Sequence, residues 1–144
     1  MKKVRVITVA VLVGVLLTAL TVPALTQEMD TEALIELFIS DPVEAANKIL
    51  ELAATDPGAA AFVLAGVAER IAELRATDPD RADVLEGSLI GTCIELIDTQ
   101  PLVLVLAIRL MQDRDLDIGD KIEMIATALG LEYEYLLAAS PIAP

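Results

Sequence analysis

The stretch from Pro101 to Gln112 reads PLVLVLAIRLMQ, and its apolar residues lie on every side of a helix rather than along one stripe. A helix that is apolar all round is either buried inside a fold or crosses a membrane, and this stretch is too short to cross one. The sequence therefore predicts a helix from Pro101 to about Gln112. It also places Pro101–Met111 at the centre of the protein.

Further helices are predicted on both sides of this stretch, because apolar residues recur at steps of three and four and no long alternating stretch appears. Aspartate caps a helix N-terminus and proline fits its first turn, so Asp-Pro pairs mark several of the expected starts. Residues 131–139 alternate over five positions like a strand, but their Leu, Glu and Ala content favours a last short helix. The predicted fold class is all-α, a compact bundle of about five to six short helices after an N-terminal signal or anchor helix. The expected starts before the last helix are Thr31, Pro42, Pro57, Pro79 or Asp80, Pro101, and a position just after Asp120, which with Glu123 would form a capping box.

Three of the expected turns recur at a fixed interval. Thr55-Asp-Pro, Thr77-Asp-Pro and Thr99-Gln-Pro lie 22 residues apart. Intervals of this size occur in repeat proteins, but few other positions match between the units. Reuse of a favourable helix cap explains most of the similarity, and the spacing leaves a true repeat open.

Composition excludes several classes of function. Ten basic residues stand against 23 acidic ones, which gives a net charge of −13, so the protein lacks the positive surface that nucleic-acid binding requires. The chain has no histidine and one cysteine, Cys93, which excludes the usual zinc sites, Ser-His and Cys-His nucleophile pairs and an intrachain disulfide. Cys93 falls on the apolar stripe of its helix and is expected to be an inert core residue. These absences predict a protein that is not an enzyme.

The N-terminus has the pattern of an export signal. A basic start, with Lys2, Lys3 and Arg5, precedes the uncharged run VITVAVLVGVLLTALTV at residues 6–22. This run is typical of a cleaved signal peptide, and it also reaches the lower length limit of a membrane anchor. Both interpretations divide the chain into a signal or anchor at 1–26 and one acidic helical domain at 27–144. Both also place that domain outside the cytoplasm, in the periplasm or secreted, and the second interpretation anchors it by residues 6–22.

One acidic segment could bind a metal. Residues 113–123 read DRDLDIGDKIE and resemble the start of an EF-hand calcium loop, in which alternating carboxylates surround the cation. Asp113, Asp115, Asp117 and Asp120 are therefore weak calcium candidates. Position twelve counted from Asp113 is Met124, so the closing glutamate of an EF-hand is missing. The alternative is a solvated loop whose acids favour the N-terminus of the following helix.

The sequence thus predicts an exported, non-enzymatic acidic helical module. We expect it to act by protein–protein interaction or by self-association, in the cell envelope or outside the cell, with no cofactor and with membrane contact only through its N-terminal segment. A strong negative charge favours basic partners. The second hypothesis, from a different class, is a calcium-responsive module that uses the loop from Asp113 to Asp120.

Overall fold

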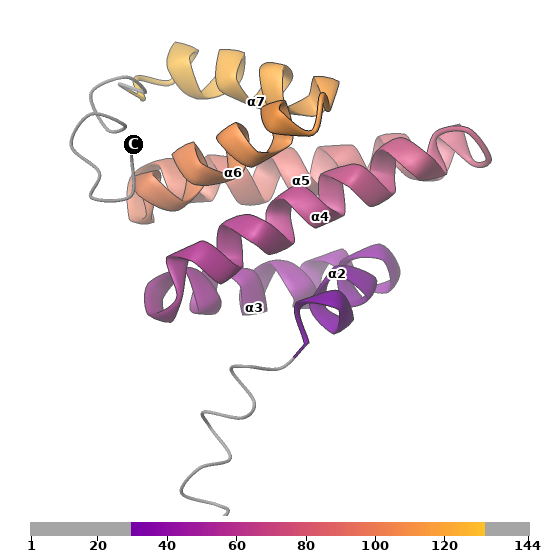
Figure 1. The fold of residues 1–144 in the computed structure, drawn as a ribbon, viewed down its shortest axis with the longest axis horizontal. Coiled ribbons are helices and arrows are strands. Elements are labelled where there is room, and N and C mark those ends of the chain that lie inside the picture. Colours follow the sequence, from indigo (N-terminus) through magenta and orange to yellow (C-terminus); the bar gives the residue numbers. More distant parts are fainter. Residues whose placement is uncertain (1–29, 132–144) are drawn as a thin grey trace, which may run out of the picture. The chain divides into compact units, whose positions relative to one another are not determined.

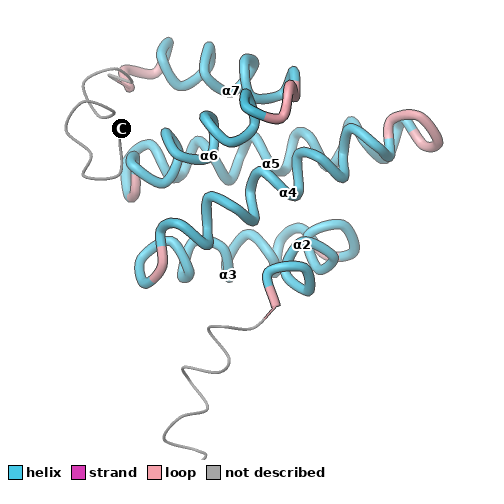
Figure 2. Tube along the Cα trace, viewed as in Figure 1, coloured by secondary structure: helices cyan, strands magenta, loops and turns pink. Residues whose placement is uncertain are grey.

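The computed structural model describes residues 30–131, which form six helices and no strands. Figures 1 and 2 show their arrangement. The prediction of an all-α fold is therefore confirmed for this part of the chain. The predicted signal or anchor at 1–26 and, apart from Leu131, the short helix expected at 131–139 lie outside the described residues. The helices are α2 (Thr31–Ser40), α3 (Pro42–Thr55), α4 (Pro57–Leu74), α5 (Pro79–Thr99), α6 (Pro101–Asp113) and α7 (Asp117–Ala128).

Three of these helices begin as the Asp-Pro pairs predict. Asp41, Asp56 and Asp78 are the N-caps of α3, α4 and α5, and a proline follows each at the first helical position. The side chain of each aspartate accepts a hydrogen bond from the backbone N–H three residues later, at 3.3, 3.1 and 3.2 Å respectively. Gln100 precedes Pro101 in nearly the same backbone conformation, yet its side chain makes no capping hydrogen bond. The three Asp-Pro turns therefore share one capping arrangement, and whether the 22-residue spacing is a true repeat stays open.

Single residues link several of the helices. Asp41, Asp56 and Gln100 each stand alone between two helices. The backbone N–H of each donates to the carbonyl oxygen four residues earlier, at 2.6, 2.7 and 2.8 Å, and so closes the preceding helix. Two of the three also cap the following helix with their side chains. One residue therefore ends one helix and begins the next.

The start of α7 differs from the prediction. We expected Asp120 to be its N-cap, but the helix begins at Asp117, its N-cap is Leu116, and no side chain caps it. Asp120 lies in the first turn of α7. The physical reason is packing, because Ile118 and Gly119 are buried and hold the chain in the helix one turn earlier. Local capping chemistry is worth about 1 kcal/mol, and burial of an apolar turn outweighs it.

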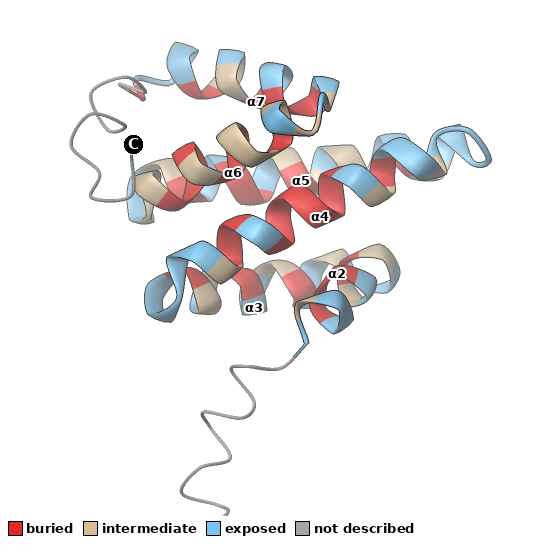
Figure 3. Ribbon diagram, viewed as in Figure 1, coloured by how far each residue is buried: buried red, intermediate tan, exposed pale blue. Residues whose placement is uncertain are grey.

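The centre of the fold is α4 rather than α6. Figure 1 shows α4 between the α2–α3 pair on one side and α6 with α7 on the other, and α4 packs against α2, α3, α5 and α6. Its buried stripe is visible in Figure 3. Ala60, Leu64, Val67 and Ile71 of α4 are all buried, and Leu74 at its end is half-buried. The expectation that Pro101–Met111 would be central was wrong, since α6 leaves Leu102, Leu106 and Leu110 only half-buried.

Two glycines allow helices to approach closely. A Cβ at Gly66, in α4, would overlap Cδ1 of Ile35 in α2 and lie 3.2 Å from its Cγ1. A Cβ at Gly119, in α7, would lie 2.8 Å from Cβ of Met111 in α6. Internal packing therefore requires a residue without a side chain at both positions. Within the described part of the chain, no helix is both long enough and apolar enough to cross a membrane.

Candidate functional site

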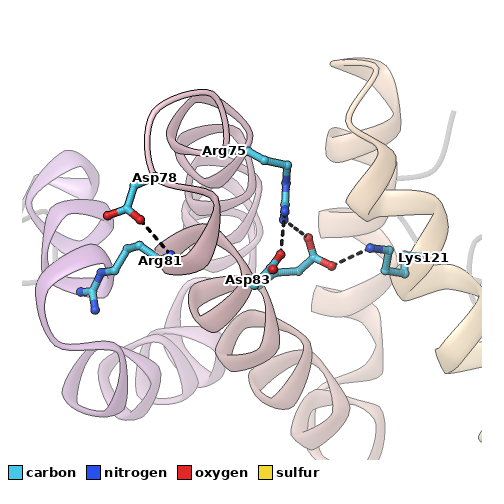
Figure 4. Close-up of polar contacts among 6 residues, drawn as sticks. Arg75, Asp78, Arg81, Asp83 and Lys121 are labelled. Atoms are coloured by element: carbon cyan, nitrogen blue, oxygen red, sulfur yellow. Dashed lines mark hydrogen bonds and ion pairs between the residues drawn. The ribbon is translucent and has the colours of Figure 1, made fainter.

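The largest polar cluster joins three elements of the fold, as Figure 4 shows. Glu86 of α5 accepts hydrogen bonds at 2.6 Å from Arg75, which follows α4, and from Lys121 of α7. Arg75 also donates to Asp83 at 2.6 Å. The hydrogen bond to Asp83, together with the charge of Glu86, raises the pKa of the Arg75 guanidinium. We call these four residues the Glu86 cluster.

The Glu86 cluster lies beside a cavity of about 420 Å³ whose lining includes Arg75, Glu86 and Lys121. Asp115 and Asp117 also line this cavity. The side chain of Glu86 is only 16% exposed, and its two cationic partners balance its charge. These hydrogen bonds link the end of α4 with α5 and α7, so the Glu86 cluster has a structural role.

Basic side chains elsewhere are also occupied by partners within the chain. Arg70 binds Glu36, and this hydrogen bond lowers the pKa of the Glu36 carboxyl. Arg114 lies 5.2 Å from the ring centre of Phe62 and 3.4 Å from Glu69. Between residues 30 and 131, six of the seven basic side chains have a carboxylate or carbonyl partner. These six are Lys48, Arg70, Arg75, Arg81, Arg114 and Lys121.

Many carboxylates of the described region, in contrast, have no cation beside them. Exposed examples are Glu51 on α3, Asp80, Glu95 and Asp98 on α5, and Asp113 at the end of α6. Because six of the seven described cations are already paired, little positive charge is left to offset these carboxylates. The described surface is therefore predominantly acidic.

The four calcium candidates lie around the turn between α6 and α7. Asp113 ends α6, Asp115 has the left-handed φ of 58°, and Asp117 begins α7. Asp120 accepts a hydrogen bond from Nε2 of Gln112 at 3.0 Å. Among residues 30–131, no three or more acidic, histidine or cysteine side chains are grouped so that they could hold a metal ion. The structure does not bring the four aspartates together, and calcium binding stays a prediction.

Cys93 lies in the core, as predicted. Its side chain is 1% exposed, on the buried stripe of α5 with Leu85, Leu89 and Leu96. Burial raises the pKa of the Cys93 thiol to about 12. A thiol with this pKa is almost wholly protonated at neutral pH, so it is a poor nucleophile.

The outer face of α5 carries a row of exposed residues that our sequence analysis missed. The row follows the alternating steps of four and three at which helices pack against one another. Its spacing could have been read from the sequence, but we searched for stripes that face inward. We call this row the α5 seam, and its members are Asp80, Val84, Gly87, Gly91, Ile94 and Asp98, all exposed.

An apolar groove adjoins the α5 seam. Ile90, Ile94 and Ile97 of α5 line one wall, and Ile122 and Ile125 of α7 line the other. Ile94 belongs to both the groove and the seam and is 40% exposed. Val84 and Ile94 are the exposed large apolar side chains of the seam, and Ile94 also adjoins the apolar lining between α5 and α7.

The geometry thus defines a class, an all-helical protein with an exposed row of residues along α5 and ion pairs between its own helices. Comparison with protein-family models, with curated proteins and with solved structures finds no match to the chain.

Proposed function

We propose that this protein is an exported, non-enzymatic acidic helical module that acts by binding a protein, either a foreign partner or a second copy of itself. Its place of action would be the cell envelope or the outside of the cell. The observation that carries the proposal is the distribution of charge. Six of the seven described cations are paired within the chain, while carboxylates such as Glu51, Glu95 and Asp98 face solvent without a cation.

This distribution affects how the protein meets partners. A one-signed surface speeds the approach of oppositely charged proteins and opposes the approach of anionic ones, including nucleic acids and anionic lipids. The buried thiol of Cys93 and the satisfied carboxylate of Glu86 offer no activated nucleophile or base. The acidic surface and the absence of an activated group at Cys93 or Glu86 both support a binding role over a catalytic one.

Export can be tested with the full-length chain carrying a C-terminal tag, expressed in a bacterial host and fractionated. We expect the tag in the periplasmic, secreted or membrane fraction, and the intact mass then separates a cleaved signal from an anchor. A variant with Leu16→Arg and Leu17→Arg interrupts the apolar run and should stay in the cytoplasm. If the unaltered chain also stays in the cytoplasm, the proposal of export fails.

The calcium-responsive alternative has its own test. The molar mass of the purified protein is measured by light scattering in chelator and then in millimolar calcium, and its thermal unfolding is followed in both buffers. A change of mass or of midpoint that Asp115→Asn with Asp117→Asn abolishes would support the alternative. Identical behaviour in both buffers would exclude it.

A further inference from the structure

The α5 seam has the spacing of a helix-packing surface but no helix of the described chain covers it. Its six members alternate by steps of four and three from Asp80 to Asp98, and all six are exposed. That periodicity keeps side chains aligned along a second helix over several turns. The other faces of α5 already pack against α3, α4, α6 and α7. The seam is therefore an unpartnered face of a helix that is otherwise enclosed.

The two glycines at the middle of the seam need an explanation outside the internal packing. Glycine in a helix interior costs about 1 kcal/mol relative to alanine. At Gly66 and Gly119 the close packing of two helices offsets this cost, because a Cβ there would collide with Ile35 or Met111. A Cβ at Gly87 or Gly91 would meet no atom within 4 Å. Their lack of a side chain serves nothing within the described fold, and it leaves a shallow strip into which another helix can fit closely.

The apolar part of the surface extends beyond the glycines. Val84 is 60% exposed at one end of them and Ile94 is 40% exposed at the other. Beside Ile94, the groove between α5 and α7 is lined by apolar side chains, Ile90 and Ile125 among them. A partner helix whose backbone crosses the glycines would lay apolar side chains over Val84 and Ile94, beside this apolar lining.

Charge at the two ends of the seam decides between possible occupants. Asp80 and Asp98 lie 18 residues apart on α5, which separates them by roughly 27 Å, and neither has a cationic partner in the described part of the chain. A second copy of α5 would place Asp80 against Asp98 if antiparallel, or each aspartate against its equivalent if parallel. Either arrangement opposes like charges, which disfavours self-association through this face.

We infer that the α5 seam binds a helix of a foreign protein that carries small or apolar residues along the contact and a lysine or arginine near each end. The inference rests on the proposed function, because it names the surface and the kind of partner for the same binding role. Apolar contact at Val84 and Ile94 holds the helix in place, and the two aspartates select the basic partner and fix its register.

The test uses the full-length protein in a mild detergent and a synthetic helical peptide of about 22 residues. The peptide has alanine and leucine at steps of four and three and two lysines 18 residues apart. A control peptide has glutamate in place of both lysines. Fluorescence anisotropy of the labelled peptides gives the dissociation constants, and circular dichroism verifies that every protein variant is folded.

We expect the lysine peptide to bind and the glutamate peptide to bind far more weakly. Ile94→Glu and Gly91→Leu should each weaken binding by roughly tenfold or more, because each removes or blocks apolar contact at the centre. Asp98→Asn should weaken it by about two- to fivefold, as expected for an exposed ion pair. Val43→Glu is the matched control, since Val43 is 74% exposed on α3, and it should leave binding unchanged.

The possible results separate this inference from the proposed function. If the lysine peptide binds the unaltered protein and Ile94→Glu equally well, the acidic surface binds basic helices elsewhere, and the seam is refuted while the proposed function stands. If light scattering shows a dimer that Ile94→Glu dissociates, a second copy is the occupant and the foreign helix is refuted. If deletion of residues 132–144 greatly strengthens binding, the chain's own C-terminal segment is the occupant. If no basic peptide binds at low salt, the seam inference is refuted, while the proposed function is judged by the oligomeric state and by the export test.

Discussion

Replacing Gly66 by alanine should destabilise the fold, although alanine is the better helix former. The higher helix propensity of alanine would by itself raise the free energy of unfolding by about 1 kcal/mol. Against it, the new Cβ would overlap Cδ1 of Ile35, whose side chain is only 3% exposed and would have to shift within the core. Overpacking of this kind costs about 1–3 kcal/mol. The net effect is a loss of about 1 kcal/mol in the free energy of unfolding.

Gly91 provides the matched comparison for this prediction. It also lies inside a helix, but a Cβ there meets nothing within 4 Å, so Gly91→Ala should stabilise the protein by about 1 kcal/mol. The propensity term is common to both substitutions and cancels in their difference. That difference, about 2 kcal/mol, therefore measures the close approach of α2 and α4 alone.

The assay is urea unfolding followed by circular dichroism, with the midpoint and the slope fitted for each variant. Ile35→Val removes the colliding Cδ1 and should recover most of the loss when it is combined with Gly66→Ala. A double-mutant cycle isolates that coupling. Should Gly66→Ala stabilise the protein as much as Gly91→Ala does, the inferred packing of α2 on α4 is wrong.

Three further predictions concern a thiol, an ion-pair cluster and a helix cap. Burial holds the pKa of the Cys93 thiol above its ordinary value, so its contribution to stability is complete below about pH 9 and is lost as the pH rises toward about 12. Urea unfolding at pH 8–11 should show the free energy of unfolding falling by up to about 1.4 kcal/mol per pH unit above pH 9, and Cys93→Ala should make this fall less steep. If the pH dependence of the Cys93→Ala variant equals that of the unaltered protein, the assignment to Cys93 is wrong. Glu86→Gln should lower the free energy of unfolding by about 1–2 kcal/mol, because Glu86 is largely buried and binds two cations. Asp83→Asn, at a side chain that is 70% exposed, should leave the urea midpoint nearly unchanged. Gln100→Asp should supply the missing cap of α6 and raise the melting temperature by about 4 °C, and no rise would mean that α6 begins differently.

The sequence predicted most helix starts because they depend on local chemistry. Asp41, Asp56 and Asp78 each precede a proline, and an aspartate that caps and a proline that cannot continue a preceding helix act within a few residues. The start of α7 was not predictable in this way. There the contact of Ile118 and Gly119 with a distant part of the chain overrides the local preference for Asp120 as a cap.

The choice of central helix failed for a related reason. The sequence pointed to α6 because apolar residues lie on every side of it, but a helix is central when several neighbours can approach it. In α4, small residues at Ala61, Ala65, Gly66 and Ala68 provide that access and are all buried. Which helices pack against these small residues is tertiary information that the apolar pattern does not carry.

The candidate surfaces show the same division between local and tertiary information. The sequence indicated a turn within Asp113–Asp120, but the turn is shorter than expected because Asp117–Asp120 already belong to α7. Whether the carboxylates converge depends on backbone geometry, such as the left-handed residue at Asp115. The spacing of the α5 seam residues, in contrast, can be read directly from the sequence. What the sequence could not supply is that this face of α5 is exposed, because that depends on where α3, α4, α6 and α7 pack.

The single-residue links at Asp41, Asp56 and Gln100 restrict how this protein can change in length. Each link closes one helix and begins the next, so an inserted or deleted residue there would disrupt two helices at once. Additions within a helix would turn everything beyond them by about 100° and move buried side chains to the surface. Between α2 and α7, only residues 75–78 and 114–116 offer a longer connection. Natural length variants, tags and inserted domains should therefore be found at these two turns or at the chain ends, while the helices between them keep a fixed length.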